Sequence, residues 1–204
     1  MTHMFEDCSS LEVLKIPKLS TENSVSLTNL FSNCSNLKEI DVSSFDTTRV
    51  QELNYMFYNC KSLTSIYFGP EDRLNVWDTT EVLYTTSMFE GCTSLKSLNL
   101  NKFITNKLVM ATAMFKNCSR LENLQLNNFT TTEVLYMDEM FAGVTSLRDL
   151  YLPRFNTVNV FDANNMWDGI TDLNLTIDPV LNQNILKNLP PGINVTNITN
   201  IMVE

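Results

Sequence analysis

The chain has 204 residues, of which 44% are hydrophobic and 18% are charged, so it is long and apolar enough to fold around a buried core. Its formal net charge is −9, and this acidic balance disfavours binding to nucleic acid or to anionic lipid, since both need a basic surface. No apolar run approaches the roughly 18 residues of a membrane helix, and no signal-like segment opens the sequence.

A repeat runs through almost the whole chain. A Met-Phe pair or a close substitute recurs at steps of 26, 26, 32, 26, 26 and 26 residues, so one repeat carries six extra residues. Near-copies at one spacing are typical of an array in which each repeat packs on its neighbours. The seven pairs begin at Met4, Leu30, Met56, Met88, Met114, Met140 and Met166.

Each repeat opens with a segment such as "MFYN" or "MFKN", which favours a single helical turn. The segment ends at a column that holds only Gly, Asn and Asp, the residues that best tolerate a left-handed backbone. This column therefore predicts the end of the turn. Its members are Asp7, Asn33, Asn59, Gly91, Asn117, Gly143 and Gly169.

An invariant leucine follows, and after it apolar and polar residues alternate, as in "LKEIDV" and "LENLQL". This period of two predicts a short strand in each repeat. Further on, a large residue is followed two places later by threonine, and we expect each threonine hydroxyl to bond nearby backbone and close the coil. The leucines are Leu11, Leu37, Leu63, Leu95, Leu121, Leu147 and Leu173, and the threonines are Thr21, Thr47, Thr79, Thr105, Thr131 and Thr157.

One such repeat cannot bury its own apolar side, whereas stacked repeats can. The sequence therefore predicts an α/β solenoid over residues 1–177, with seven repeats of about 26 residues, a parallel ladder of strands and short helical turns. The six extra residues form an insertion near residues 69–75. Residues 178–204 depart from the pattern: "VLNQNILKNL" predicts a helix with Leu181, Ile185 and Leu189 on one face, and "PPGINVTNITNIMV" predicts a final strand. Together they predict a C-terminal cap.

All five cysteines occupy one column of the repeat, and the last two repeats hold Val144 and Ile170 there. A position that accepts Val and Ile requires a small apolar side chain, which a free thiol also supplies. Stacking would bring neighbouring Cα atoms about 4.8 Å apart, within disulfide range, but side chains in register point in parallel and five is an odd number. We therefore predict buried free thiols, with disulfides and, less favoured, a metal site or nucleophile as the alternatives. The column is Cys8, Cys34, Cys60, Cys92 and Cys118.

The sequence predicts no catalytic site. His3 is the only histidine and precedes the first repeat, so a Ser-His-Asp or Cys-His arrangement would have to use it. The carboxylates fall at changing columns, which favours a solvated acidic surface. With five glycines in the whole chain, no glycine-rich phosphate loop is present. We expect no enzyme activity, no cofactor and no metal site.

The strand face is the predicted binding surface. In each strand the residue between the last two apolar positions points away from the core. These residues form a polar strip with two tyrosines, a mix that suits protein recognition, and a solvated sheet with stabilising cross-strand pairs is an equal alternative. The strip is Lys15, Asp41, Tyr67, Asn99, Gln125 and Tyr151, and the insertion adds Glu71, Asp72 and Arg73 as a second candidate.

The pattern of residues 114–134, "MFKNCSRLENLQLNNFTTTEV", resembles that of BspA-like leucine-rich-repeat surface proteins, in particular the variant associated with mycoplasma lipoproteins. The resemblance extends from Met4 to Ile177. It implies a leucine-rich-repeat horseshoe, a cell-surface or secreted setting, adhesion to host proteins or other protein recognition, and no catalytic residues.

We therefore predict a non-enzymatic interaction or adhesion module whose partner is a protein, such as a host surface or matrix protein. No nucleic acid partner and no membrane insertion by this segment are expected. The alternative is a structural spacer or assembly subunit without a dedicated ligand. We expect binding on the strand face rather than on the opposite side of the array.

Overall fold

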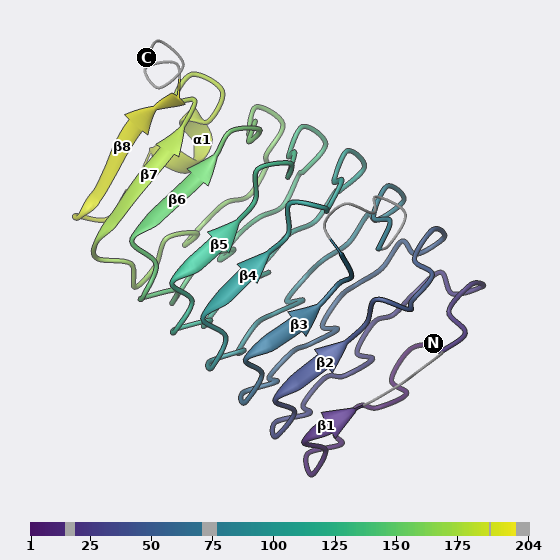
Figure 1. Ribbon diagram of the computed structural model, residues 1–204. Coiled ribbons are helices and arrows are strands. Elements are labelled where there is room, and N and C mark those ends of the chain that lie inside the picture. Colours follow the sequence, from purple (N-terminus) through teal and green to yellow (C-terminus); the bar gives the residue numbers. More distant parts are fainter. Residues whose placement is uncertain (15–18, 71–76, 188, 199–204) are drawn as a thin grey trace.

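The computed structural model describes residues 1–14, 19–70, 77–187 and 189–198. The chain forms a parallel β-solenoid of about six turns with almost no helix. Its short strands lie side by side in chain order, and the first and the last strand lie at opposite ends of the solenoid (Figure 1). The elements are β1 (Val13–Leu14), β2 (Glu39–Asp41), β3 (Ser65–Tyr67), β4 (Ser97–Asn99), β5 (Asn123–Gln125), β6 (Asp149–Leu152), β7 (Leu173–Ile177), α1 (Gln183–Leu186) and β8 (Ile193–Asn197).

The strand pairing follows the sequence repeat. Ile40 in β2 faces Ile66 in β3, and Leu98 in β4 faces Leu124 in β5, so each residue lies beside its equivalent in the next repeat. In β2 and β4 the middle residue is buried and its two neighbours are exposed, which gives the period of two. The predicted parallel ladder is confirmed. Among the described residues it is divided into three hydrogen-bonded sheets, β1–β2–β3, β4–β5 and β6–β7–β8.

A second, narrower ladder runs along another side of the solenoid. In each coil a single residue forms a parallel bridge with its equivalent in the next coil. The sequence does not predict this ladder, because one paired residue per coil leaves no alternating run to detect. The bridged residues are Ser26, Glu52, Tyr84, Met110, Tyr136 and Asp162.

The Met-Phe segments are successive turns, and the predicted helical turns are not confirmed. The residue before the pair and the residue that ends the segment have positive φ, as at Tyr55 (56°) and Asn59 (55°). Alternate N–H groups donate to the next coil: Tyr55 to the Thr86 carbonyl at 2.9 Å and Asn59 to the Glu90 carbonyl at 2.8 Å. Because these donors point along the solenoid axis, they are not available for helical bonds.

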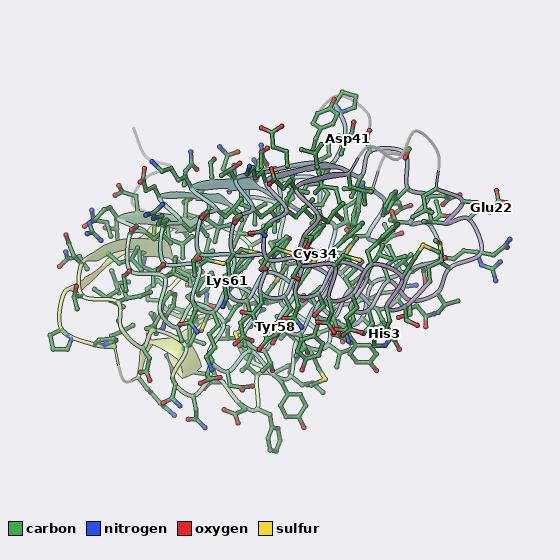
Figure 2. The ribbon with its side chains drawn as sticks, turned by 90° about the horizontal axis from the view of Figure 1, so that it is seen from below. His3, Glu22, Cys34, Asp41, Tyr58 and Lys61 are labelled. Atoms are coloured by element: carbon green, nitrogen blue, oxygen red, sulfur yellow. The ribbon has the colours of Figure 1, made fainter. Side chains whose placement is uncertain are left out.

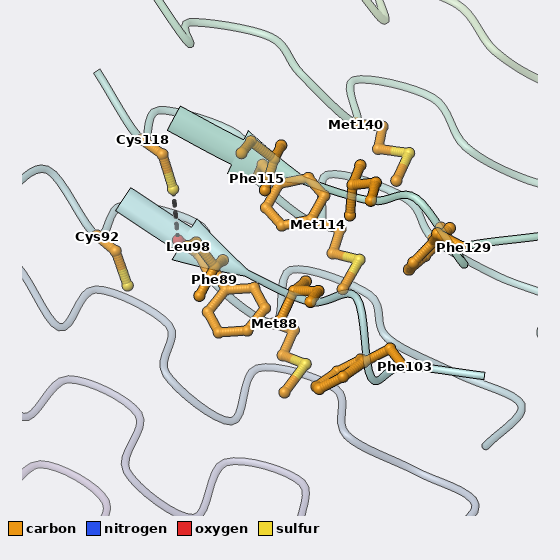
Figure 3. Close-up of a cluster of buried hydrophobic side chains, with 14 of the residues drawn as sticks. Met88, Phe89, Cys92, Leu98, Phe103, Met114, Phe115, Cys118, Phe129 and Met140 are labelled. Atoms are coloured by element: carbon orange, nitrogen blue, oxygen red, sulfur yellow. Dashed lines mark hydrogen bonds between the residues drawn. The ribbon is translucent and has the colours of Figure 1, made fainter. Parts of the chain in front are cut away.

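The core is made of columns of equivalent side chains that run along the array (Figure 3). The aromatic rings of the Met-Phe segments stack in one column from Phe5 to Trp167, with neighbouring centroids 5.1–5.8 Å apart. The leucine column is fully buried except at Leu11, which is half-buried. Each ring or leucine therefore buries its surface mainly against its equivalents in the adjacent coils.

Each threonine hydroxyl was expected to close its own coil, and this prediction is wrong. Thr131 Oγ1 donates to the Asn156 carbonyl at 2.9 Å and accepts the Asn156 N–H at 2.8 Å, so it connects one coil to the next. The hydroxyls of Thr21 and Thr47 are buried and have no hydrogen-bond partner in the described parts of the chain. Those threonine hydroxyls of the column that form hydrogen bonds therefore connect adjacent coils.

The C-terminal residues close part of the last coil. Ile185 in α1 is buried, and its carbonyl accepts the Nε1–H of Trp167 at 3.0 Å, so α1 covers the end of the aromatic column. β8 pairs in parallel with β7, as expected for a final strand. The helix is shorter than predicted: of the three residues expected on its apolar face, only Ile185 lies within α1.

Candidate interaction surfaces

The predicted strip on the strand face lies at the surface. Asp41, Tyr67, Asn99 and Tyr151 are exposed, and Gln125 is half-buried. The two tyrosines retain 50% and 40% of their accessible surface, respectively. The remaining candidates, Lys15, Glu71, Asp72 and Arg73, lie outside the described residues.

Several polar members of the strip bond neighbouring residues. Asp41 Oδ1 accepts the N–H of Ser43 at 2.9 Å, and Asn99 Oδ1 accepts the N–H of Asn101 at 2.9 Å. These two bonds stabilise the turns that follow β2 and β4. The structure also separates the two tyrosines, since Tyr67 lies in the β1–β2–β3 sheet and Tyr151 in the β6–β7–β8 sheet. These polar residues therefore have a structural role whether or not the strip binds a ligand.

A second candidate surface follows the bridge ladder and was missed by the sequence analysis. In each coil two consecutive residues lie outward here, and in every coil but the last they stand between buried neighbours. Over four consecutive coils these outward residues are almost all apolar, and they define what we call the apolar ladder face: Leu83, Tyr84, Val109, Met110, Leu135, Tyr136 and Phe161.

The exposure of the apolar ladder face increases toward the C-terminal end. Leu83 and Val109 are half-buried, Leu135 is 38% exposed and Phe161 is 88% exposed. Hydrogen bonds hold the backbone in place, because the Leu83 carbonyl accepts the N–H groups of Val109 (2.8 Å) and Met110 (3.2 Å). The side chains are thus presented by a paired ladder rather than by a free loop.

A sequence signal for this face exists. The tripeptide "VLY" occurs at residues 82–84 and again at 134–136, two repeats apart. Its Val is buried in both places, whereas its Leu and Tyr lie at the surface. A pair of consecutive large apolar residues at the same place in several repeats is the sequence signal for this face, because only one of two neighbouring residues can usually point into the core.

The strand side and the turn side of the solenoid lie opposite each other. Figure 2 shows Asp41 on the strand side, His3 and Tyr58 on the turn side, and the Cys34 side chain between them. Tyr58 packs edge-on against Tyr55, with ring centroids 5.7 Å apart. The solenoid therefore offers separate surfaces that one ligand of modest size could not contact together.

The cysteine column forms part of the core. All five thiols are free, and four are buried. Cys118 Sγ–H donates to the Phe89 carbonyl of the preceding coil at 3.0 Å (Figure 3). Burial raises the pKa of Cys118 to about 12, so the thiol is neutral and unreactive at pH 7. Cys8 is exposed, and the prediction of a buried thiol is wrong there because no coil of the structure packs on its outer side.

Ionisable side chains form pairs rather than clusters. His3 Nδ1 lies 2.6 Å from Glu6 Oε2, and Lys107 Nζ lies 2.6 Å from Glu81 Oε1 in the preceding coil. Within the described ranges, no three His, Cys, Asp or Glu side chains gather in a way that could hold a metal ion. In the same ranges, no helix is long and apolar enough to cross a membrane.

These features define a class: a repeat protein with a parallel β-solenoid fold and exposed ladder faces. The family described as "Mycoplasma protein of unknown function, DUF285" matches residues 1–69 and 65–180, and the chain belongs to this family. No curated protein and no solved structure matches the chain. The finding supports a mycoplasma repeat protein, and the closer resemblance to BspA-like proteins stays a prediction.

Proposed function

We propose that the chain is a non-enzymatic protein-interaction module, and that the apolar ladder face is its main binding surface. The observation that supports this proposal is a contiguous row of apolar side chains on a paired backbone, half-buried in the first two coils and exposed in the last two. Contiguous exposed apolar patches on soluble proteins commonly mark interaction sites, because water contact with such a patch is unfavourable.

The composition of the face suits protein recognition. Tyr84, Met110 and Tyr136 occupy successive rungs of the bridge ladder. Tyrosine and methionine are enriched at protein interfaces, where they contribute large contact areas. Four coils at about 4.8 Å each span roughly 15 Å, so a single face is small and would bind with modest affinity unless copies act together.

The electrostatics of the chain suggest the type of partner. Asp and Glu outnumber Lys and Arg by 23 to 14. Carboxylates flank the apolar ladder face, among them Glu133 on the same coil as Tyr136 and Asp162 at the last rung. A protein with apolar residues surrounded by basic ones would complement this surface.

The strand strip with Tyr67 and Tyr151 is the second proposed surface, and it rests on the sequence pattern. The resemblance to BspA-like proteins further supports a seven-repeat, leucine-rich-repeat-like array with an adhesive role at the cell surface. The competing proposal is a structural spacer or assembly subunit with no dedicated ligand.

A binding assay separates these proposals. The whole chain is immobilised and tested against a panel of purified host matrix and surface proteins. If the apolar ladder face binds, Leu135→Ser with Tyr136→Ser should weaken binding by more than about 1 kcal/mol, roughly fivefold in Kd. The matched control is Lys107→Ala, which changes an exposed charged side chain that pairs with Glu81 and should leave Kd unchanged.

The same assay tests the strand strip with a separate double variant. If Tyr67→Ala with Tyr151→Ala weakens binding and the Leu135 and Tyr136 changes do not, the strand face is the binding surface. If no protein of the panel binds the unaltered chain, the spacer proposal is favoured. Thermal unfolding of each variant checks that the fold is retained.

A further inference from the structure

The last coil of the solenoid has an open edge. In the preceding coil the N–H of Met137 donates to the Asp162 carbonyl (2.8 Å), and the N–H of Glu139 donates to the Asn164 carbonyl (2.9 Å). The equivalent donors of the last coil are the N–H groups of Ala163, Asn165 and Trp167. In the described parts of the chain none of these three has an acceptor.

The bridge ladder ends at the same edge. The Leu135 carbonyl accepts the N–H groups of Phe161 (2.7 Å) and Asp162 (3.2 Å). Its equivalent one coil later, the Phe161 carbonyl, receives no N–H from any described residue. Among the described residues, the Phe161 carbonyl and the N–H groups of Ala163, Asn165 and Trp167 thus lie along residues 161–167 without a partner, and we call this segment the open coil edge.

The described C-terminal residues leave this edge uncovered because they form a shorter coil. β8 begins only seven residues after the end of α1, and the Leu173 N–H donates to the Gly192 carbonyl at 3.0 Å. Gly192 has φ +95°, and a Cβ there would lie 1.9 Å from the Thr171 carbonyl oxygen, so only glycine allows this close crossing. The turn segment that every earlier coil supplies at this place is omitted.

A cavity of about 500 Å³ lies where the omitted segment would run. Its lining includes Phe161, Ala163, Asn165 and Trp167 from the last coil, and Ile185 and Lys187 from the C-terminal residues. Asn165 has φ 56°, the same as its equivalent Glu139, whose N–H is bonded to the next coil. The free donors are thus already held in the geometry that binds carbonyls elsewhere in the array, which lowers the ordering cost of binding.

We propose that the open coil edge is a peptide-binding site, in which a segment of a partner protein adds to the last coil as one further turn segment. Its carbonyls accept the N–H groups of Ala163, Asn165 and Trp167, and one of its N–H groups donates to Phe161. Addition of a chain to an unpaired edge is an established mode of peptide recognition.

The side chains at the edge define the ligand further. Phe161 is 88% exposed and offers an apolar contact beside the free backbone groups. Asp162, Asp168 and Lys187 line the cavity, so its charge is net acidic among the residues that the structure describes. The ligand is therefore a neutral or basic peptide with an apolar residue next to Phe161, rather than an inorganic anion or an acidic peptide.

A peptide with the repeat's own sequence is the direct probe. Residues 109–117, "VMATAMFKN", form the turn segment of an interior coil, and both ends are blocked to remove terminal charges. The matched control carries Pro in place of Ala113. Ala113 has φ 53°, which proline cannot adopt, so the control cannot take up the turn conformation.

Amide hydrogen exchange of the whole chain, resolved by NMR, reads the three donors individually. In the free chain the amides of Ala163, Asn165 and Trp167 should exchange at least about tenfold faster than those of Met137, Glu139 and Phe141. The probe at about 1 mM should slow them about tenfold, and the proline control should not. Phe161→Ala should weaken the effect several-fold, whereas Leu135→Ala, one coil earlier, should leave it unchanged.

Three results would overturn the proposal. The three amides could already be slow in the free chain, the probe could fail to slow them, or they could become slow with rising protein concentration alone, which would identify a second copy as the occupant. The proposal does not depend on the apolar ladder face binding a matrix protein, because the exchange readout is confined to the open coil edge.

Discussion

The first coil and an interior coil contain the same columns but differ in burial. Cys92 and Leu95 are fully buried, whereas their equivalents Cys8 and Leu11 are exposed and half-buried. The interior coil has a neighbour on each side, and the first coil of the structure has only one. The comparison shows that a column fixes which residues face inward, and that neighbouring coils determine how much of each residue is buried.

Substitutions in the leucine column should give the largest difference in stability between the first coil and an interior coil. Leu95→Ala should lower the free energy of unfolding by roughly 2–5 kcal/mol, because it leaves a cavity in a fully buried site. Leu11→Ala should cost less than half as much, since Leu11 is already half-buried. Urea unfolding followed by circular dichroism measures both values. Equal losses below about 1 kcal/mol would contradict stacking as the source of stability.

Alanine substitutions at the glycines that end the turn segments should distinguish backbone strain from a steric clash of the added Cβ atom. Gly91 and Gly169 have φ of +75° and +78°, so alanine is strained at both, by about 1 kcal/mol. A Cβ at Gly91 would also lie 2.5 Å from Asn59 Oδ1, whereas at Gly169 the nearest heavy atom is 3.6 Å away. We therefore expect Gly91→Ala to cost about 2 kcal/mol and Gly169→Ala about half of that. A larger cost at Gly169 in thermal unfolding would reject this explanation.

Two valine substitutions in the threonine column should have opposite effects on stability. Thr131→Val removes a hydroxyl that bonds both backbone groups of Asn156, and we expect a loss of about 1–2 kcal/mol. Thr47→Val removes a buried hydroxyl without a partner in the described residues, so stability should stay the same or increase slightly. Paired denaturant titrations measure the difference, and a destabilising Thr47→Val would indicate a bond that this interpretation omits.

Titration of the buried thiols should leave the stability of the fold almost unchanged at neutral pH and lower it slightly at alkaline pH. Burial raises the pKa of Cys34 to about 11 and of Cys118 to about 12, from an ordinary value of 9.0. Below pH 9 these thiols are neutral in both the folded and the unfolded chain. Above pH 9 the unfolded chain loses thiol protons that the folded chain retains, so stability should fall as the pH rises through this range.

Cys118→Val tests this linkage, because valine already occupies the same column at position 144. The variant should match the unaltered chain near pH 7 and lose less stability between pH 9 and pH 11. Ile170→Val is the matched control and should leave the pH dependence unchanged, since it changes the same column without adding or removing a thiol. A thiol reagent should likewise modify Cys8 first in native buffer, and equal rates at all five thiols would contradict the assigned burial.

Much of the solenoid could be predicted from the sequence. The spacing of the Met-Phe pairs gave the repeat, and the alternation after Leu37 or Leu121 gave strands in the register observed. The substitution of Val144 and Ile170 for cysteine indicated core positions, and both are buried. These features depend on side-chain polarity at regular spacing, which is a property of the sequence itself.

The turn segments and the two edges could not be predicted in the same way. Tyr55, Ala113 and Glu139 adopt positive φ although none of them favours it, and hydrogen bonds to the next coil hold them there. The outward position of Tyr136 and the free N–H groups of Ala163 and Asn165 likewise depend on what lies beside them in space. The repeat and its inward columns follow from the sequence alone, because they depend on local polarity. The backbone of the turns and the accessible edges depend on the tertiary structure, because they are set by hydrogen bonds between coils and by contacts of the C-terminal residues with distant parts of the chain.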